Sequence, residues 1–184
     1  MAIRSQIENR NFLSPTGFKF ILTRAPKVSF FANTANIPSL SMGNAIQTSY
    51  LKDIPVPGDK VEFGDFTLRF IVDENLENYI QMYKWIRGLG YPESLKEIFD
   101  FQENDPKGAP KKEVDGLNIY SDGTLQVLSS NYRPQFNIVF RDMFPVDLTS
   151  LDFDATNNDI DYFTAEVTFK YTIYDIQDTE GNRL

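Results

Sequence analysis

The sequence contains no cysteine and no histidine in its 184 residues. The absence of cysteine excludes disulfides, thiolate metal ligands and cysteine nucleophiles. The absence of histidine removes the usual general base near neutral pH and the commonest ligand of transition metals. Only carboxylate, lysine, serine or tyrosine chemistry remains, so we expect a protein that is not an enzyme and that has no cofactor.

Positive charge is also scarce, with 18 Lys and Arg against 26 Asp and Glu and a formal net charge of −8. Such a balance argues against a general electrostatic affinity for nucleic acid or for anionic membranes. No stretch approaches the ~18 apolar residues of a membrane span. The first residues lack the apolar core of a secretory signal. We therefore expect synthesis in a cytoplasm and no membrane insertion by this chain.

Apolar residues make up 41% of the chain and aromatic residues 14%, which is enough to build a hydrophobic core. We expect a single domain over residues 1–184, since no linker divides the sequence. Residues 1–15 form a polar arm with too little apolar surface to fold alone. Residues 103–115 contain two prolines and a glycine without periodicity, and they predict a surface loop.

The end of the chain shows a strand pattern. From Phe163 to Ile173 apolar and polar residues alternate, which predicts one half-buried strand with Phe163 on the core side. The preceding segment, 141–154, predicts a compact turn built on Phe144–Pro145. A strand of this length is more typical of a protein that forms an extended wall than of one that encloses a ligand pocket.

Other alternating segments predict further strands. Residues 18–22 and 28–32 predict a β-hairpin, and residues 66–72 predict another strand. Ser121-Asp-Gly123 predicts a hairpin turn between flanking strands. Residues 36–58 contain three prolines, which cannot donate to a ladder, so we expect an edge strand or a long projecting loop with a turn at residues 57–59.

One helix is predicted after Asp73, a plausible N-cap, and before Gly88 and Gly90. Its apolar face has the 3, 4, 7 spacing of a helix and consists of Leu76, Tyr79, Ile80, Tyr83 and Ile86. Trp85 belongs either to the core, which is favoured, or to a patch that meets a partner. Together these elements predict a mainly β fold of the α+β class: an antiparallel β-sandwich or barrel with one flanking helix.

Acidic clusters invite a metal site. Residues 154–161 carry Asp and Asn oxygens in a loop, as calcium sites do, but lack the glycine and closing glutamate of an EF-hand loop. A solvated turn is the better interpretation, and we predict no metal site.

Three blocks carry a family resemblance. Residues 57–75 running into 79–85, residues 143–154 followed by 160–171, and Ile37–Pro38 resemble, in order, the tail tube proteins of contractile-tailed phages, including tube-like baseplate proteins. The resemblance implies a non-enzymatic virion subunit that forms stacked hexameric rings inside a sheath, rooted on a baseplate. The lumen of such a tube holds a tape measure protein and passes DNA during genome ejection.

Two sets of residues are candidates for this role. The polar face of the last long strand is the candidate lumen surface: Thr164, Glu166, Thr168, Lys170 and Thr172. The extended segments supply the candidate subunit interface: Ile46, Thr48, Tyr50, Ile54, Phe12 and Leu13.

Two alternatives stay open. A baseplate protein that initiates the tube would have the same fold and differ in copy number per particle. An oligonucleotide-binding barrel or a carbohydrate-binding β module would also contain short strands and many aromatic residues.

Overall fold

The computed structural model describes residue 13 and residues 15–90, 92–97, 119–153 and 162–184. The predicted loop at 103–115, the acidic segment 154–161 and Phe12 lie outside the described residues. Within them the fold is mainly antiparallel β, as predicted, with two helices where one was expected. The sheet is not closed into a barrel, because β1 and β2 are the two ends of its strand order.

The elements in chain order are β1 (Phe18–Leu22), α1 (Pro26–Phe30), β2 (Ala32–Ala35), β3 (Leu40–Gln47), β4 (Ile54–Phe63), β5 (Phe66–Ile71), α2 (Glu77–Gly90), β6 (Ser121–Leu128), β7 (Pro134–Leu148), β8 (Thr164–Lys170) and β9 (Ile173–Gln177).

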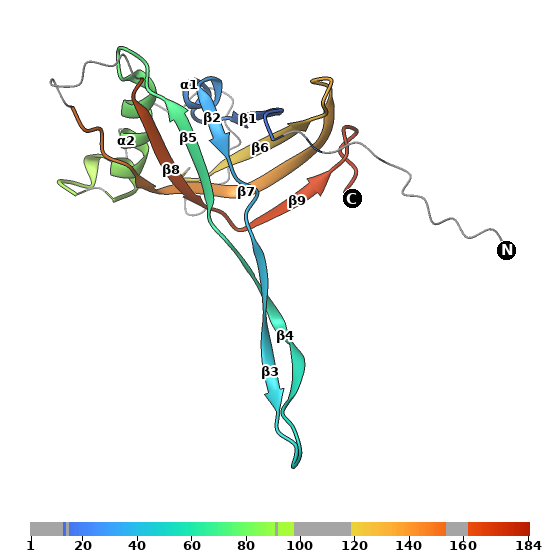
Figure 1. Ribbon diagram of the computed structural model, residues 1–184. Helices are drawn as coiled ribbons and strands as arrows, with labels where there is room; N and C mark the ends of the chain where they lie inside the picture. Colours follow the sequence, from blue (N-terminus) through green and yellow to red (C-terminus); the bar gives the residue numbers. More distant parts are fainter. Residues whose placement is uncertain (1–12, 14, 91, 98–118, 154–161) are drawn as a thin grey trace.

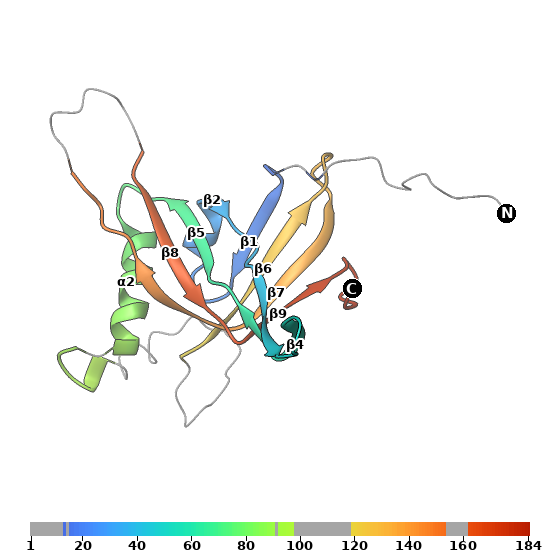
Figure 2. The same ribbon diagram turned by 60° about the horizontal axis from the view of Figure 1, so that its bottom comes forward.

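The long strand β7 belongs to both halves of the main sheet. Residues 137–140 pair with β6 on one side and with β9 on the other, whereas residues 144–148 pair with β8. The strand changes direction at Asp142, whose φ of 55° lies in the left-handed region that aspartate tolerates better than most residues. The result is one half made of β1, β6, β7 and β9 and another made of β7, β8, β5 and β2 (Figure 2).

The core lies between the two halves and is rich in aromatic rings. The ring of Phe66 on β5 lies 5.1 Å from that of Phe20 on β1 and 4.7 Å from that of Phe140 on β7. Fully burying a side chain of this size is worth about 1.5–3 kcal/mol. Phe66 therefore joins the two halves of the sheet.

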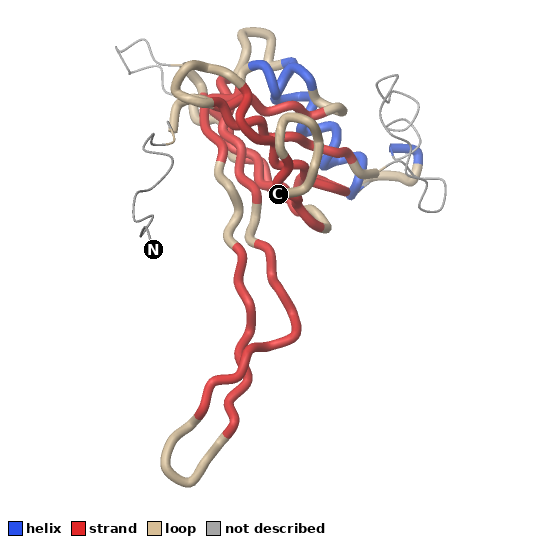
Figure 3. Tube along the Cα trace, turned by 90° about the vertical axis from the view of Figure 1, so that its right-hand side faces the viewer, coloured by secondary structure: helices blue, strands red, loops and turns tan. Residues whose placement is uncertain are grey.

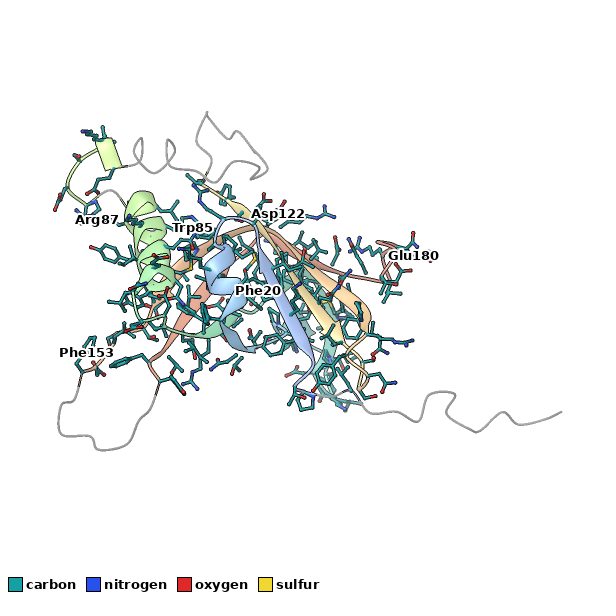
Figure 4. The ribbon with its side chains drawn as sticks, turned by 90° about the horizontal axis from the view of Figure 1, so that it is seen from above. Phe20, Trp85, Arg87, Asp122, Phe153 and Glu180 are labelled. Carbon is teal, nitrogen blue, oxygen red and sulfur yellow. The ribbon has the colours of Figure 1, made fainter. Side chains whose placement is uncertain are left out.

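Helix α2 covers the core at one end (Figure 4). Its Met82 and Trp85 are buried, and the Trp85 ring lies 6.1 Å from Phe169. The indole Nε1 donates a hydrogen bond of 3.2 Å to the carbonyl of Ile119, and the Arg24 guanidinium lies 5.3 Å from the ring centroid. The prediction that Trp85 belongs to the core is confirmed.

The predicted apolar face of this helix is wrong in part. Tyr79 packs against the core and Leu76 and Ile86 are half-buried. Ile80 is 40% exposed and Tyr83 49%, while the buried residues are Asn78, Met82, Trp85 and Gly88. The buried face was not recognisable from apolar spacing because it includes a polar residue, Asn78. This side chain is fully buried and donates from Nδ2 to the Ile71 carbonyl at 2.8 Å. Capping by Asp73 holds in part, since its carboxylate accepts the Asn78 N–H at 3.3 Å although the helix begins only at Glu77.

The single strand predicted over 163–173 is two strands. β8 ends at Lys170 and β9 begins at Ile173. Each of them pairs with a different part of the bent β7, so the chain breaks where β7 changes direction. Phe163 was expected on the core side but is 40% exposed.

The compact turn predicted over 141–154 is also wrong, because β7 continues through Phe144 and Pro145 to Leu148. Pro145 faces Phe169, and the register shifts between Pro145 and Asp147. Bulges are among the few places where a sheet accepts proline. Residues 144–148, which were predicted to lie in a turn, therefore form a bulged strand.

The two predicted hairpins are replaced by pairings between distant segments. Pro26 opens α1 between β1 and β2, as proline does at a first helical position. β1 then pairs with β6, and β2 pairs with β5. Asp122–Gly123 lies inside β6, where an added Cβ at residue 123 would lie 2.4 Å from the Met143 sulfur. Packing, and not a turn, therefore requires that glycine.

We predict that Phe66→Ala lowers the free energy of unfolding by about 3–5 kcal/mol, because it leaves a cavity between the two sheet halves. Urea unfolding followed by fluorescence measures the change. Phe153→Ala is the matched control, because that side chain is 75% exposed and its loss is expected to cost under about 0.5 kcal/mol. Equal losses in the two variants would contradict the placement of Phe66.

Candidate assembly surfaces

Strands β3 and β4 form a hairpin that leaves the body of the molecule and projects away from it (Figures 1 and 3). They pair with each other only, as a separate two-stranded sheet, among the described residues. Residues 36–58, predicted as an edge strand or a long projecting loop, contain β3, the tip and the first part of β4. The hairpin continues to Phe63, and residues 57 and 58 lie within β4 together with Asp59 instead of forming a turn.

Large apolar side chains stand exposed along this hairpin. Their exposed fractions run from 38% to 102%, and they belong to Leu40, Met42, Ile46, Tyr50, Leu51, Ile54, Val56 and Val61. An isolated two-stranded hairpin is marginally stable in water. Exposed apolar surface of this extent marks an interaction site in most proteins. The hairpin is therefore a candidate contact surface for another molecule.

The base of the hairpin is fixed to the body by three aromatic rings. The Phe63 ring lies 6.2 Å from Tyr171 and 5.4 Å from Tyr174. The Tyr171 hydroxyl donates to the carbonyl of Gly64 at 2.8 Å, and the Tyr174 hydroxyl donates to that of Pro38 at 3.3 Å. Both strands of the hairpin are thus held where they enter the body.

Burial of the phenol raises the pKa of Tyr171 to about 12, with smaller contributions from the nearby Tyr174 and the carboxylate of Asp65. Desolvation disfavours the charged phenolate and so favours the neutral hydroxyl that donates to Gly64.

The pairing of β3 with β4 is interrupted by a bulge, where the register shifts between Met42 and Asn44. A Cβ added at Gly58 would lie 2.4 Å from the carbonyl oxygen of Gly43. Only glycine at position 58 permits this close approach of the two strands.

Polar side chains follow one face of β8, as predicted. Thr164, Glu166, Thr168 and Lys170 point away from the core, while Ala165, Val167 and Phe169 are buried. Thr172, the fifth candidate of this set, is exposed but lies in the break after β8.

Side chains of opposite charge lie next to one another on this polar face. Arg69 of β5 stands opposite Glu166, and the Lys170 ammonium pairs with the Asp65 carboxylate. The face therefore presents paired charges between threonines and has no large excess of either sign. Helix α2 packs on the other side of this sheet, where its Trp85 meets Phe169.

The candidate interface residues divide between two places. Ile46, Thr48, Tyr50 and Ile54 come together on the distal part of the hairpin. Leu13 is 53% exposed and precedes β1, away from the hairpin strands in sequence and in pairing. Sequence reasoning missed Leu40, Met42, Leu51, Val56 and Val61, although the period-two spacing of Leu40 and Met42 was a usable signal.

The edge of β9 is covered by the C-terminal residues. Gln177 forms a bridge with Arg183, and the Leu184 N–H donates to the Ile176 carbonyl at 3.0 Å. The buried Asp175 carboxylate lies 2.9 Å from Arg141 Nη2 and 2.8 Å from Arg183 Nη2. These contacts hold the returning chain beside β9.

The described residues contain no group of three or more acidic side chains placed to hold a metal ion. No helix among them is long and apolar enough to cross a membrane.

We predict that Tyr171→Phe costs about 0.5–1.5 kcal/mol of stability at neutral pH, because it removes the hydrogen bond to Gly64. In the unmodified protein the folded-state pKa of Tyr171 exceeds the ordinary value of 10.0, so the contribution of this group to stability is constant below pH 10 and falls as pH rises from 10 to 12. Urea unfolding at several pH values checks this, and Tyr132→Phe at an exposed site is the control. An unchanged alkaline slope in Tyr171→Phe would contradict the assignment.

No protein-family model and no curated protein matches the sequence. Solved structures do match. A chain of the tube-terminating cap of the anti-feeding prophage has a TM-score of 0.64 at 16% identity, covering 97% of this chain and 100% of that one. A chain of the sheath-tube complex of an extracellular contractile injection system, PVC, in the extended state has a TM-score of 0.58 at 18% identity, with coverage of 97% and 100%.

A chain of the 6-fold symmetrised anti-feeding prophage baseplate has a TM-score of 0.56 at 10% identity, covering 89% of this chain and 92% of that one. All three matches span nearly the whole of both chains at identities that establish the fold alone. The split sheet and the helix at its end are thus the fold of a chain from a tube cap, of a chain from a sheath-tube complex and of a chain from a baseplate.

Proposed function

We propose that this chain is a structural subunit of the tube of a contractile tail or injection particle, in which copies form rings that stack into a conduit. One observation carries the proposal: a hairpin that bears eight large exposed apolar side chains projects from a body with the fold of chains found in such particles. A chain that acted alone would leave this surface in water.

Assembly follows from a contact between unlike surfaces. When a hairpin of one copy meets a different surface of the next, the contact is head-to-tail, and its repetition closes a ring or continues as a filament. The expected arrangement is a hexameric ring, stacked on others, with the arm 1–15 contributing further contacts.

The polar face of β8 borders the lumen in this arrangement. Paired charges such as Lys170 with Asp65 leave little net field to hold a charged cargo. A wall that neutralised many phosphates would retain DNA through counterion release. The balanced face suits a conduit that lets a genome and a tape measure protein pass.

The opposite side of the molecule would face outward, toward a sheath. Helix α2 exposes Ile80 and Tyr83 there, on the side of the sheet away from β8's polar face. A baseplate would contact the first ring of the tube.

A protein at one end of the tube is the second candidate. The matches to a tube-terminating cap and to a baseplate, with TM-scores of 0.64 and 0.56, favour it as much as the sheath-tube match at 0.58 favours a repeating subunit. Copy number per particle separates them, because a tube subunit is present in many rings and a terminal protein in one. Quantitative mass spectrometry of purified particles measures it.

We predict that the double variant Tyr50→Ser/Leu51→Ser abolishes assembly and leaves the fold intact. Both side chains are almost fully exposed at the hairpin tip, at 102% and 89%, so the body loses no packing. Negative-stain microscopy and sedimentation velocity measure assembly, and thermal unfolding measures the fold. The matched control is Leu95→Ser/Tyr132→Ser, at 65% and 71% exposure away from the hairpin. Normal tubes from the tip variant would refute the role of the hairpin.

We predict that Thr168→Cys becomes inaccessible to a bulky maleimide reagent when the protein assembles, because position 168 then lines the lumen. The natural chain has no cysteine, so labelling reports on the introduced thiol alone. Lys84→Cys, on the exposed side of α2, is expected to label equally before and after assembly. Equal labelling of Thr168→Cys from outside intact tubes would place β8 elsewhere.

A further inference from the structure

The two free edges of the projecting hairpin differ in chemistry. β3 (Leu40–Gln47) contains neither proline nor a charged residue, whereas β4 contains Pro55 and Pro57 together with Asp59, Lys60 and Glu62. Prolines and charges are the usual means by which proteins prevent other chains from pairing with a strand edge.

The ladder geometry gives the direction of each backbone donor. The Gly64 N–H donates to the Ser39 carbonyl at 2.9 Å, so the facing pair 39 and 64 is a hydrogen-bonded pair. Pairs alternate along an antiparallel ladder, so the next pair, Leu40 with Phe63, directs its N–H groups outward. On β3 the outward donors are those of Leu40, Met42, Asn44 and Ile46.

Asn44 and Ile46 lie beyond the register shift, and there the prolines give the direction. Pro57 faces Asn44 and Pro55 faces Ile46. Because proline has no N–H to donate to the ladder, we infer that both pairs direct their nitrogens outward. The two prolines therefore leave the internal ladder intact and remove outward donors from the distal half of β4. The proximal half of that edge carries the three charged side chains.

We propose that the hairpin recruits a second copy of this chain through the β3 edge alone, by adding β3 to an open strand edge of its neighbour. This inference rests on the proposed tube function and deepens it by naming the surface that pairs. Because the β4 edge is blocked, only one of the two edges of each hairpin pairs with a neighbouring copy.

A second copy offers edges of the required kind. β1 and β2 end the strand order of the main sheet, so each has one strand partner within the described residues, and neither contains proline or an acidic residue. The β9 edge is less suited, because residues 183 and 184 already bond along it.

The test compares proline substitutions at outward positions of the two edges in the full chain. Asn44→Pro removes an outward donor from β3, Asn44→Ala removes the same side chain but keeps the donor, and Val61→Pro removes an outward donor from β4, since Val61 faces Met42. We expect Asn44→Pro to raise the concentration needed for tube assembly at least tenfold, and the other two to change it less than twofold. Sedimentation velocity gives these concentrations, and thermal unfolding checks the body.

Any other pattern overturns the inference: equal loss in both proline variants, loss only in Val61→Pro, loss also in Asn44→Ala, or loss in none. Hydrogen exchange of the unmodified protein gives an answer without substitution. The amides of Met42, Asn44 and Ile46 are expected to become protected on assembly, and that of Val61 is not. Tubes that lack this protection would refute the pairing and leave the proposed function standing. An unmodified chain that stays monomeric at high concentration would refute both.

Discussion

The bend of β7 at Asp142 is the constraint on which the rest of the structure depends. Because the strand changes direction there, its first part pairs with β6 and β9 and its second with β8. The chain breaks between β8 and β9, which pair with different parts of β7. Tyr171 in that break and Tyr174 in β9 lie beside Phe63, where their hydroxyls hold both strands of the hairpin. The base of the hairpin is thus held by residues that lie where the chain changes its partner along β7.

The molecule divides its apolar surface between two purposes. Rings such as Phe20, Phe66 and Phe140 are buried and join the halves of the sheet. Eight large apolar residues between Leu40 and Val61 are exposed instead, whereas Phe63 at the base of the hairpin packs on Tyr171 and Tyr174. A single chain therefore contains one apolar surface that folds it and another that remains exposed. The paired charges on the outer face of β8 belong to neither.

The two hairpin edges show how such a surface avoids indiscriminate association. Exposed strands recruit other chains along either edge unless one is blocked. Pro55 and Pro57 stand where the internal ladder needs no donor, so they blunt one edge without weakening the hairpin. A one-sided contact repeated around an axis gives a closed ring or a filament and not an irregular aggregate.

The sequence by itself determined what depends on local chemistry. Alternation predicted the buried and exposed faces of residues 164–170, three prolines predicted projecting structure at 36–58, and glycines near 88–90 predicted the end of a helix. Tertiary structure decided what depends on distant partners: the buried face of α2, hidden because Asn78 bonds to Ile71, and the course of 144–148, a strand because β8 pairs with it. It also decided that residues 121–123 extend a strand, because they pair with β7 and Gly123 also pairs with β1. The periodicity of a segment indicates which of its side chains face the core and which face water. Its pairing partner is decided only when segments far apart in the chain come together.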